Sequence, residues 1–124
     1  MTYSQLLSDV QEYIEHGGRH DRILVVVKGS NILATGIGRH DGGLALEFNS
    51  HKFIDIFKRK SFNSFCRVNN LDQLEKWKTP ECITQRAELP SSEYEVINIL
   101  KEYFRVVHKL DNDYEIQIHK RSWQ

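Results

Sequence analysis

Residues 22–48 read RILVVVKGSNILATGIGRHDGGLALEF, and this stretch decides the fold. Three apolar runs, 22–28, 32–37 and 44–48, are separated by two clusters of turn-forming residues, Gly29-Ser30-Asn31 and 39–43. Short β-branched or alternating runs divided by such turns predict a three-stranded antiparallel meander. The unbroken Val25-Val26-Val27 run indicates a first strand that is covered on both faces. In the third run Leu44, Leu46 and Phe48 alternate with Ala45 and Glu47 and predict one core-facing side.

Helical periodicity brackets the meander on both sides. Tyr3, Leu6, Leu7, Val10, Tyr13 and Ile14 form one apolar face before Gly17-Gly18, which predicts an N-terminal amphipathic helix. Ser92 and Glu95 have the spacing of a capping box. They precede a second apolar stripe that predicts the clearest helix: Val96, Ile97, Leu100, Tyr103, Phe104 and Val107. Residues 114–119 alternate between apolar and polar side chains and predict a final half-exposed strand.

Residues 50–89 have weaker patterns. We expect Ser50 to cap a short helix whose buried face carries Phe53, Ile54 and Phe57. Residues 61–68 are ambiguous, with a fourth strand as one interpretation. Leu71, Leu74 and Trp77 predict a short helix that ends before Pro80, and 82–89 is a weak strand candidate. The expected fold is therefore a single α+β domain over residues 1–124 with the order α-β-β-β-α-(β)-α-(β)-α-β. It has an antiparallel sheet of about four to six strands with helices packed on it.

The composition narrows the class of protein. The 124 residues contain 17 Lys and Arg and 17 Asp and Glu, and this zero net charge argues against a dedicated nucleic-acid-wrapping protein. A chain without net charge also lacks the repulsion that keeps proteins apart, so its composition is compatible with self-association or with binding to a partner. The two cysteines, Cys66 and Cys82, lack metal-ligand spacing and are expected to be reduced core thiols. We find no secretion signal, no apolar run long enough for a membrane span and no cofactor loop, so we expect a cytoplasmic protein without metal or cofactor.

The tetrapeptide Gly-Arg-His-Asp occurs twice, at 18–21 and 38–41. In a meander both copies fall at the same end of the sheet, so His20 and His40 could form a cluster with Asp41 and the nearby arginines. Two imidazoles and an arginine suit phosphodiester cleavage, and two His with two Asp suit a metal ion. The interpretation that we favour is simpler, because Arg, His, Asp and Gly are ordinary residues of exposed turns.

The order of helix, meander, helix and strand over residues 3–68 resembles that of the restriction-endonuclease-like nucleases. The resemblance implies that Asp41 and Glu47 are acidic residues of an active site. Asn49 stands where this family carries a lysine, and Lys52 is the nearest lysine. Asp41 also lies only six residues before Glu47, which is short for that arrangement. The alternative for Glu47 is a solvent-facing side chain on a half-buried strand.

Two further segments are candidate binding surfaces. Residues 58–67 combine Lys58, Arg59, Lys60 and Arg67 with two phenylalanines, a pattern that suits nucleic acid. The alternative, which we favour, is that Phe62 and Phe65 belong to the core and that the cations stabilise the C-terminal end of a helix. Arg39 in the second turn and Trp123 near the C-terminus complete the set of candidate binding residues.

Because the sequence contains no specific catalytic motif, we rank a binding function above an enzymatic one. We expect a small intracellular, non-enzymatic protein that contacts another macromolecule, of the inhibitor, immunity or adaptor type, with a protein as the expected partner. Homo-oligomerisation remains open. The alternative is a nucleic-acid-binding protein or nuclease that uses the His/Asp/Arg turns, with His20, His40, Asp41 and Glu47, and the basic-aromatic segment 58–67.

Overall fold

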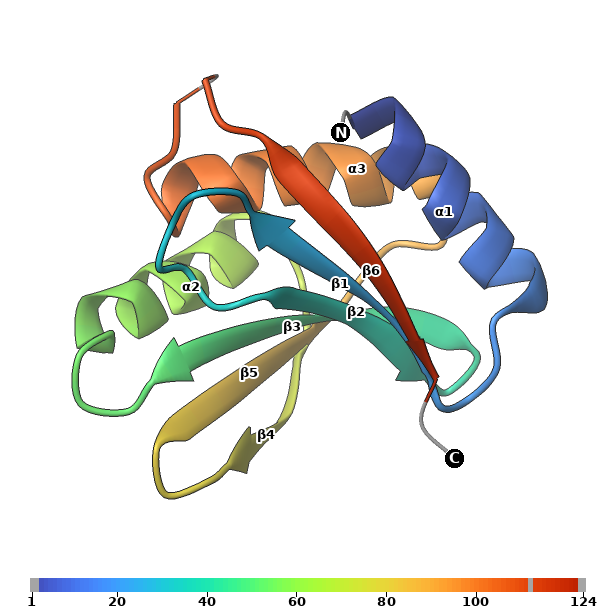
Figure 1. Ribbon diagram of the computed structural model, residues 1–124. Helices are drawn as coiled ribbons and strands as arrows, with labels where there is room; N and C mark the ends of the chain where they lie inside the picture. The colour runs from blue at the N-terminus through green and yellow to red at the C-terminus, as the bar shows by residue number, and fades with distance from the viewer. Residues whose placement is uncertain (1–2, 112, 123–124) are drawn as a thin grey trace.

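The computed structural model describes residues 3–111 and 113–122 (Figure 1). Single helices and groups of one to three strands follow one another along the chain. In chain order they are α1 (Tyr3–His16), β1 (Asp21–Val27), β2 (Thr35–His40), β3 (Gly43–His51), α2 (Ile56–Val68), β4 (Gln73–Lys78), β5 (Cys82–Glu88), α3 (Glu93–Val106) and β6 (Ile116–Ser122).

The six strands form one antiparallel sheet in the order β4-β5-β3-β2-β1-β6. The β2–β3 hairpin closes through Asp41 and Gly42, which both have positive φ angles of 45° and 82°. A two-residue turn of this kind matches the twist of the strands that it joins. The predicted α+β fold and the β1–β2–β3 meander are therefore confirmed.

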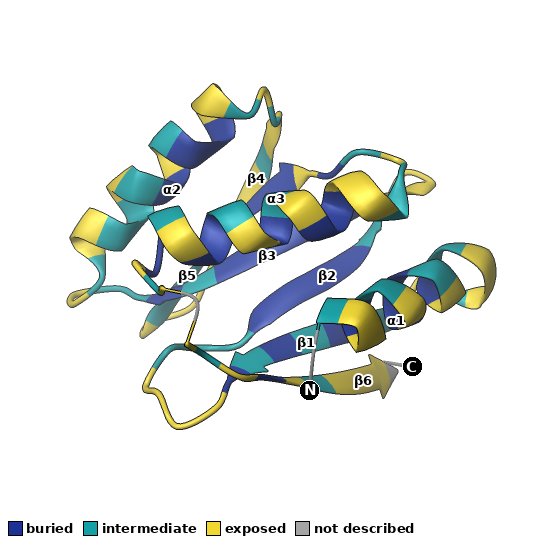
Figure 2. Ribbon diagram, turned by 90° about the horizontal axis from the view of Figure 1, so that it is seen from above, coloured by how far each residue is buried: buried dark blue, intermediate teal, exposed yellow. Residues whose placement is uncertain are grey.

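All three helices lie on one face of the sheet, with α3 between α1 and α2 (Figures 1 and 2). The core fills the space between the helices and the sheet, where Leu6, Ile37, Phe48, Phe62 and Tyr103 are at most 1% exposed. Cys66 is also buried there, and burial raises the pKa of its thiol to about 12. No helix within the described residues is long and apolar enough to cross a membrane.

None of the described helices lies on the opposite face of the sheet, which we call the open face (Figure 1). Val25 and Val27 point to the core and are buried, whereas Leu24 and Val26 point to the open face and are only half-buried. The expectation that the first strand is covered on both faces is therefore wrong. Every described helix packs on the same side, so the apolar run in β1 has helices over only one of its two faces.

The start of α2 also differs from the prediction. Ser50 does not cap a helix, because β3 continues through His51 and pairs with β5 as far as His51↔Cys82. Asp55 is the N-cap residue, and its carboxylate accepts a hydrogen bond of 2.8 Å from the backbone N–H of His51. The predicted buried face of Phe53, Ile54 and Phe57 is wrong, since these side chains are 79–80% exposed.

Long-range contacts decide the structure of the ambiguous segment 61–68 and of the segment around Leu71, Leu74 and Trp77, which was predicted to be a helix. Residues 61–68 are the second half of α2, in which Phe62 and Phe65 are core residues, as expected. Residues 73–78 form β4 rather than a helix, because pairing with β5 places Leu74 beside Arg86 and Trp77 beside Thr84. Lys58, Arg59 and Lys60 consequently lie in the first half of α2, not at its C-terminal end.

Candidate functional site

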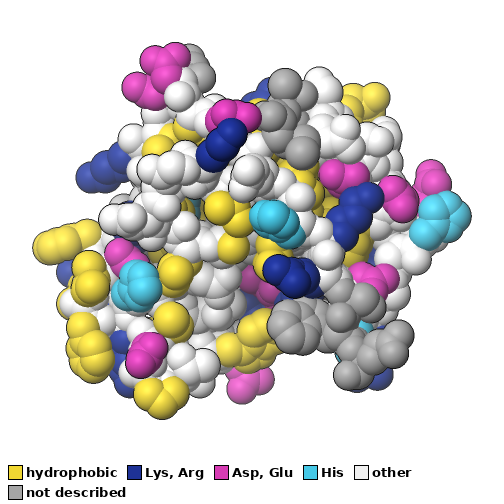
Figure 3. All heavy atoms as spheres, viewed as in Figure 1, with side chains coloured by type: hydrophobic (Ala, Val, Ile, Leu, Met, Phe, Trp, Pro, Cys, Tyr) yellow, Lys and Arg dark blue, Asp and Glu magenta, His cyan; other side chains and the backbone are white. Residues whose placement is uncertain are grey.

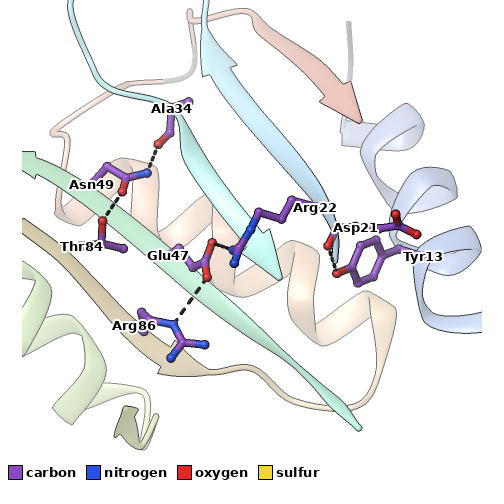
Figure 4. Close-up of polar contacts among 8 residues, drawn as sticks. All are labelled: Tyr13, Asp21, Arg22, Ala34, Glu47, Asn49, Thr84 and Arg86. Carbon is purple, nitrogen blue, oxygen red and sulfur yellow. Dashed lines mark hydrogen bonds and ion pairs between the residues drawn. The ribbon is translucent and has the colours of Figure 1, made fainter. Parts of the chain in front are cut away.

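A buried carboxylate lies at the centre of the open face. Glu47 on β3 has a side chain only 5% exposed, which overturns the solvent-facing alternative. Its Oε1 accepts a hydrogen bond from Arg22 Nη1, and its Oε2 lies 3.5 Å from Arg86 Nε (Figure 4). A buried charge is costly unless it is paired, and here two guanidinium groups compensate one carboxylate. The group of Arg22, Glu47 and Arg86 therefore carries one net positive charge.

Two glycines of β2 make this arrangement sterically feasible. Arg22 on β1 and Glu47 on β3 are separated by β2, where Gly36 pairs with Glu47. A Cβ atom at Gly36 would lie 2.8 Å from Glu47 Oε1, and one at Gly38 would lie 2.8 Å from Arg22 Nη1. The missing side chains leave the space in which the two charged groups meet.

Trp77 on β4 extends the group toward one edge of the sheet. The guanidinium carbons of Arg86 and Arg22 lie 4.1 Å and 5.2 Å from the Trp77 ring centroid, within the range of cation–π attraction. Trp77 remains 43% exposed. A hollow of about 380 Å³ opens beside it, lined by Arg19, His20, Arg22, Leu24, Glu47, Asn49, Trp77 and Thr84.

Polar contacts also fix the side of this hollow that is formed by β3 and β5. Asn49 donates a hydrogen bond of 2.7 Å to the carbonyl of Ala34 and accepts one of 2.6 Å from Thr84 Oγ1 (Figure 4). The open face thus combines oriented hydrogen-bonding groups, guanidinium groups and one indole ring in a single hollow.

The two Gly-Arg-His-Asp turns lie at the same end of the sheet, but their histidines have different surroundings. His20 lines the hollow with Glu47, whereas His40 lies in a neighbouring hollow with Asp41. Arg19 borders both hollows. His40 Nε2 is 3.4 Å from Asp41 and 3.8 Å from Glu88. Among the described residues, no three His, Cys, Asp or Glu side chains are grouped so that they could hold a metal ion.

Arg39, one of the predicted binding residues, contacts the end of α1. Its Nη2 donates to the carbonyl oxygens of Tyr13, Ile14 and Gly17, the last two at 2.9 Å and 3.1 Å. Its guanidinium carbon also lies 4.9 Å from the centre of the Tyr13 ring. The carbonyls of Tyr13 and Ile14 belong to the last turn of α1, and Gly17 follows the helix directly, so the cation lies at a helix C-terminus, where it is favourable. The contacts give Arg39 a structural role at the junction of α1 and β2.

The cations of the basic segment in α2 have different surroundings: one holds a loop, and others are exposed. Arg59 donates hydrogen bonds to Ser50 Oγ and to the carbonyls of His51 and Lys52, at 3.1, 2.9 and 2.6 Å, and so holds the loop between β3 and α2. Lys60 and Arg67 are exposed, and Arg67 contacts Ser64 at 3.2 Å. Lys58 is half-buried. Trp123 lies outside the described residues.

Exposed hydrophobic side chains gather where Arg59 holds the loop, at the left of Figure 3. We call Phe53, Ile54, Ile56 and Phe57 the apolar tip; they are 80%, 79%, 49% and 79% exposed. Lys52 lies over the Phe53 ring at 5.9 Å and Lys60 over the Phe57 ring at 5.7 Å. Contiguous exposed apolar residues with a polar rim mark interaction surfaces.

Sequence reasoning missed the exposure of the tip, although one signal was available. Phe57 and Phe62 are five residues apart, so in one helix they point roughly 140° away from each other. They therefore cannot share a buried face once both belong to α2.

The chain was also compared with known proteins. No family model, no curated protein and no solved structure matches it.

Proposed function

We propose that this is an intracellular, non-enzymatic binding protein that docks on a partner protein through the apolar tip. The observation that carries the proposal is the exposure of Phe53, Ile54 and Phe57, each 79–80% accessible in a segment of five residues. Single exposed apolar residues are common on protein surfaces. Three large ones this close together form a patch that gains free energy only when something covers it.

The tip has the properties of an interface anchor. Burying one such side chain on association is worth about 1.5–3 kcal/mol before the costs of association are subtracted. A small number of aromatic anchors typically supplies most of the binding energy of a protein interface. Arg59 holds the three residues that precede the tip through hydrogen bonds, which restrains the loop before a partner arrives. A preorganised loop loses less conformational entropy on binding.

Charge around the tip selects the kind of partner. Lys52 and Lys60 stand over the exposed rings and form a basic rim. Two copies of this chain that met tip to tip would bring like charges together, which disfavours a symmetric dimer. The proposal therefore commits to a partner protein with an apolar pocket and an acidic rim.

The test begins with retention of partners from host lysate on the immobilised protein, after nuclease treatment. The variant Phe53→Ser/Phe57→Ser removes the tip, and Val68→Ser is the control because Val68 is 81% exposed on the other end of α2. A retained protein is identified, purified and titrated against each form. We expect the tip variant to weaken its binding by at least tenfold, the control to leave it unchanged, and Lys52→Glu/Lys60→Glu to weaken it as well.

Three outcomes would overturn the proposal. The first is a partner that binds the tip variant as tightly as the wild type. The second is a tip-dependent dimer in analytical ultracentrifugation with no other partner. The third is tip-dependent binding to anionic lipid vesicles in place of a protein.

A further inference from the structure

We propose that the open face of the sheet is a binding site for single-stranded nucleic acid. The site is a row of side chains across the strands, which we call the arginine row: Arg121, Arg22, Arg86 and Trp77. It lies on the face of the sheet opposite the helices, so it is independent of the apolar tip and of α2.

The strand register places the row. Arg22 is directly opposite Arg121 on β6, and Arg86 is directly opposite Glu47 on β3. Directly opposed residues of antiparallel strands point to the same face. The row from β6 to β5 crosses four strand spacings, or roughly 19 Å. A row of side chains of this extent can contact several phosphates of one strand.

The open face is basic although the whole chain is neutral. Arg19, His20 and His119 lie beside the row, with His119 directly opposite Leu24. Carboxylates on this face include Glu47, which Arg22 and Arg86 compensate, Glu88, which lies 3.8 Å from His40, and Glu115, which precedes β6 and lies 3.8 Å from Lys28.

The acidic residues of α1 lie in the other layer of the molecule. Asp9, Glu12 and Glu15 belong to α1, which has no lysine or arginine. The helix layer is not acidic as a whole, because α2 carries Lys58, Arg59, Lys60 and Arg67 and no acidic residue, so it is the arginines of the open face themselves that make this face basic. A local excess of arginine on one face is the electrostatic footprint of nucleic-acid binding.

The hollow favours unpaired bases over a duplex. Trp77 is 43% exposed, with the guanidinium carbons of Arg86 and Arg22 over its ring, and both indole and guanidinium planes stack on bases of any sequence. Asn49 and Thr84 add hydrogen-bonding groups at the same hollow. A splayed base can enter a hollow of about 380 Å³, whereas a base within a duplex is not accessible to it.

Glu47 contributes by orientation rather than by contact with the ligand. Its buried carboxylate holds Arg22 and Arg86 on the face, and Arg22 keeps a side chain that is 28% exposed. An arginine has five N–H donors and Glu47 uses one from Arg22, so others remain for phosphate oxygens.

The experiment is a titration of fluorescein-labelled twelve-nucleotide RNA and DNA oligomers with the full chain, followed by anisotropy at several salt concentrations. Arg19→Ala/Arg121→Ala removes two cations from the open face without touching Glu47. Lys60→Ala/Arg67→Ala removes two cations from α2 and is the matched control. Trp77→Ala tests stacking, and circular dichroism verifies that each variant is folded.

We expect saturable binding that weakens with salt. The Arg19/Arg121 variant should lower the slope of log K against log salt by about 0.7 for each phosphate that the variant no longer neutralises. Trp77→Ala should raise Kd by about tenfold. The α2 variant and the tip variant Phe53→Ser/Phe57→Ser should bind like the wild type, so failure of this proposal is separable from failure of the proposed function.

The proposal is overturned by the absence of saturable binding at low salt, or by equal or tighter binding of a duplex of the same length. It is also overturned if the α2 variant loses affinity while the open-face variant keeps it, which would move the site to the basic-aromatic segment. Binding of a mononucleotide as tightly as the oligomer would identify a small-molecule pocket instead.

Discussion

Arg22 on β1 and Glu47 on β3 form an ion pair across β2, the strand that lies between them. The contact exists because β2 presents Gly36 and Gly38 beneath the two side chains. Arg86 on β5 pairs with the same carboxylate from the other side. Three strands are thus connected through one buried anion, and this connection makes definite predictions for stability.

The first prediction concerns the energetic coupling of the group. Glu47→Leu should lower the free energy of unfolding by about 3–5 kcal/mol, because it leaves two guanidinium groups without their counter-charge. Arg86→Leu should also be destabilising, since it removes half of the compensation of a carboxylate that is 5% exposed. The double variant should cost less than the sum of the two. Urea denaturation of all four forms gives the coupling energy, and strictly additive effects would show that the pair is not coupled.

The second prediction concerns the space above β2. Gly38→Ala should lower the free energy of unfolding by about 1–3 kcal/mol, because the new Cβ would lie 2.8 Å from Arg22 Nη1 and 3.2 Å from Glu47 Oε2. Gly43→Ala is the matched control, since its Cβ would meet only the His40 carbonyl at an ordinary 3.5 Å. Thermal and urea denaturation compare the two. An unaffected Gly38→Ala protein would contradict the tight approach of these side chains.

The third prediction distinguishes the two sides of α2. Phe62 is fully buried against Phe48, with ring centroids 5.1 Å apart, whereas Phe57 is 79% exposed. Phe62→Ala should cost about 3–5 kcal/mol of stability. Phe57→Ala should change stability by no more than about 0.5 kcal/mol. Similar losses in the two variants, measured by urea denaturation, would mean that the tip is buried in the isolated protein.

The fourth prediction is a pH dependence carried by His108. This side chain is 8% exposed, and its Nε2 lies 2.8 Å from the Tyr103 hydroxyl. Burial, with a smaller contribution from Lys58 and opposed by Asp55, lowers the pKa of His108 from 6.5 to about 4. The unfolded chain therefore binds a proton between pH 6.5 and 4 that the folded chain excludes. The stability from neutral His108 is complete above pH 6.5 and is lost as pH falls toward 4.

Each pH unit that separates the two pKa values corresponds to about 1.4 kcal/mol, so the full effect is on the order of 3 kcal/mol. Carboxylates titrate in the same range, so the measurement is the difference between the wild type and His108→Gln. Urea denaturation at several pH values from about 4 to about 7 should give a steeper fall for the wild type. Parallel curves would show that the pKa of His108 is the same in the folded and the unfolded chain.

The spacing of apolar residues predicted those parts of the fold in which a single helical or strand periodicity runs through the whole element. The N-terminal helix, the meander, the long helix after Ser92 and the final strand all follow from the sequence, although β2 begins at Thr35 rather than Ile32 and continues through His40, so that the predicted turn over 39–43 shortens to Asp41-Gly42. In each of them the residue spacing predicted the type of element, but burial in the meander differed, since β1 is fully buried on one face only and Glu47 is buried. Sequence also placed the two Gly-Arg-His-Asp turns at one end of the sheet, since alternate connections of a meander return to the same side.

Residues 50–78 could not be assigned in this way, because their structure depends on partners that are distant in the chain. Residues 73–78 have apolar spacing that suits a helix, but hydrogen bonds to β5 make them a strand. Ser50 belongs to β3 because β5 extends alongside it, and this moves the start of α2 by several residues and turns Phe57 outward.

The same division applies to the candidate sites. The sequence by itself determined which residues could carry charge or stack, and it determined the secondary structure wherever local periodicity was strong. Only the tertiary structure decided that Glu47 is buried between two arginines, that Arg39 and Arg59 hold backbone carbonyls, and that Trp77 lies on the open face. The physical reason is that burial and ion pairing depend on which strands become neighbours, and strand order is set by contacts between distant segments.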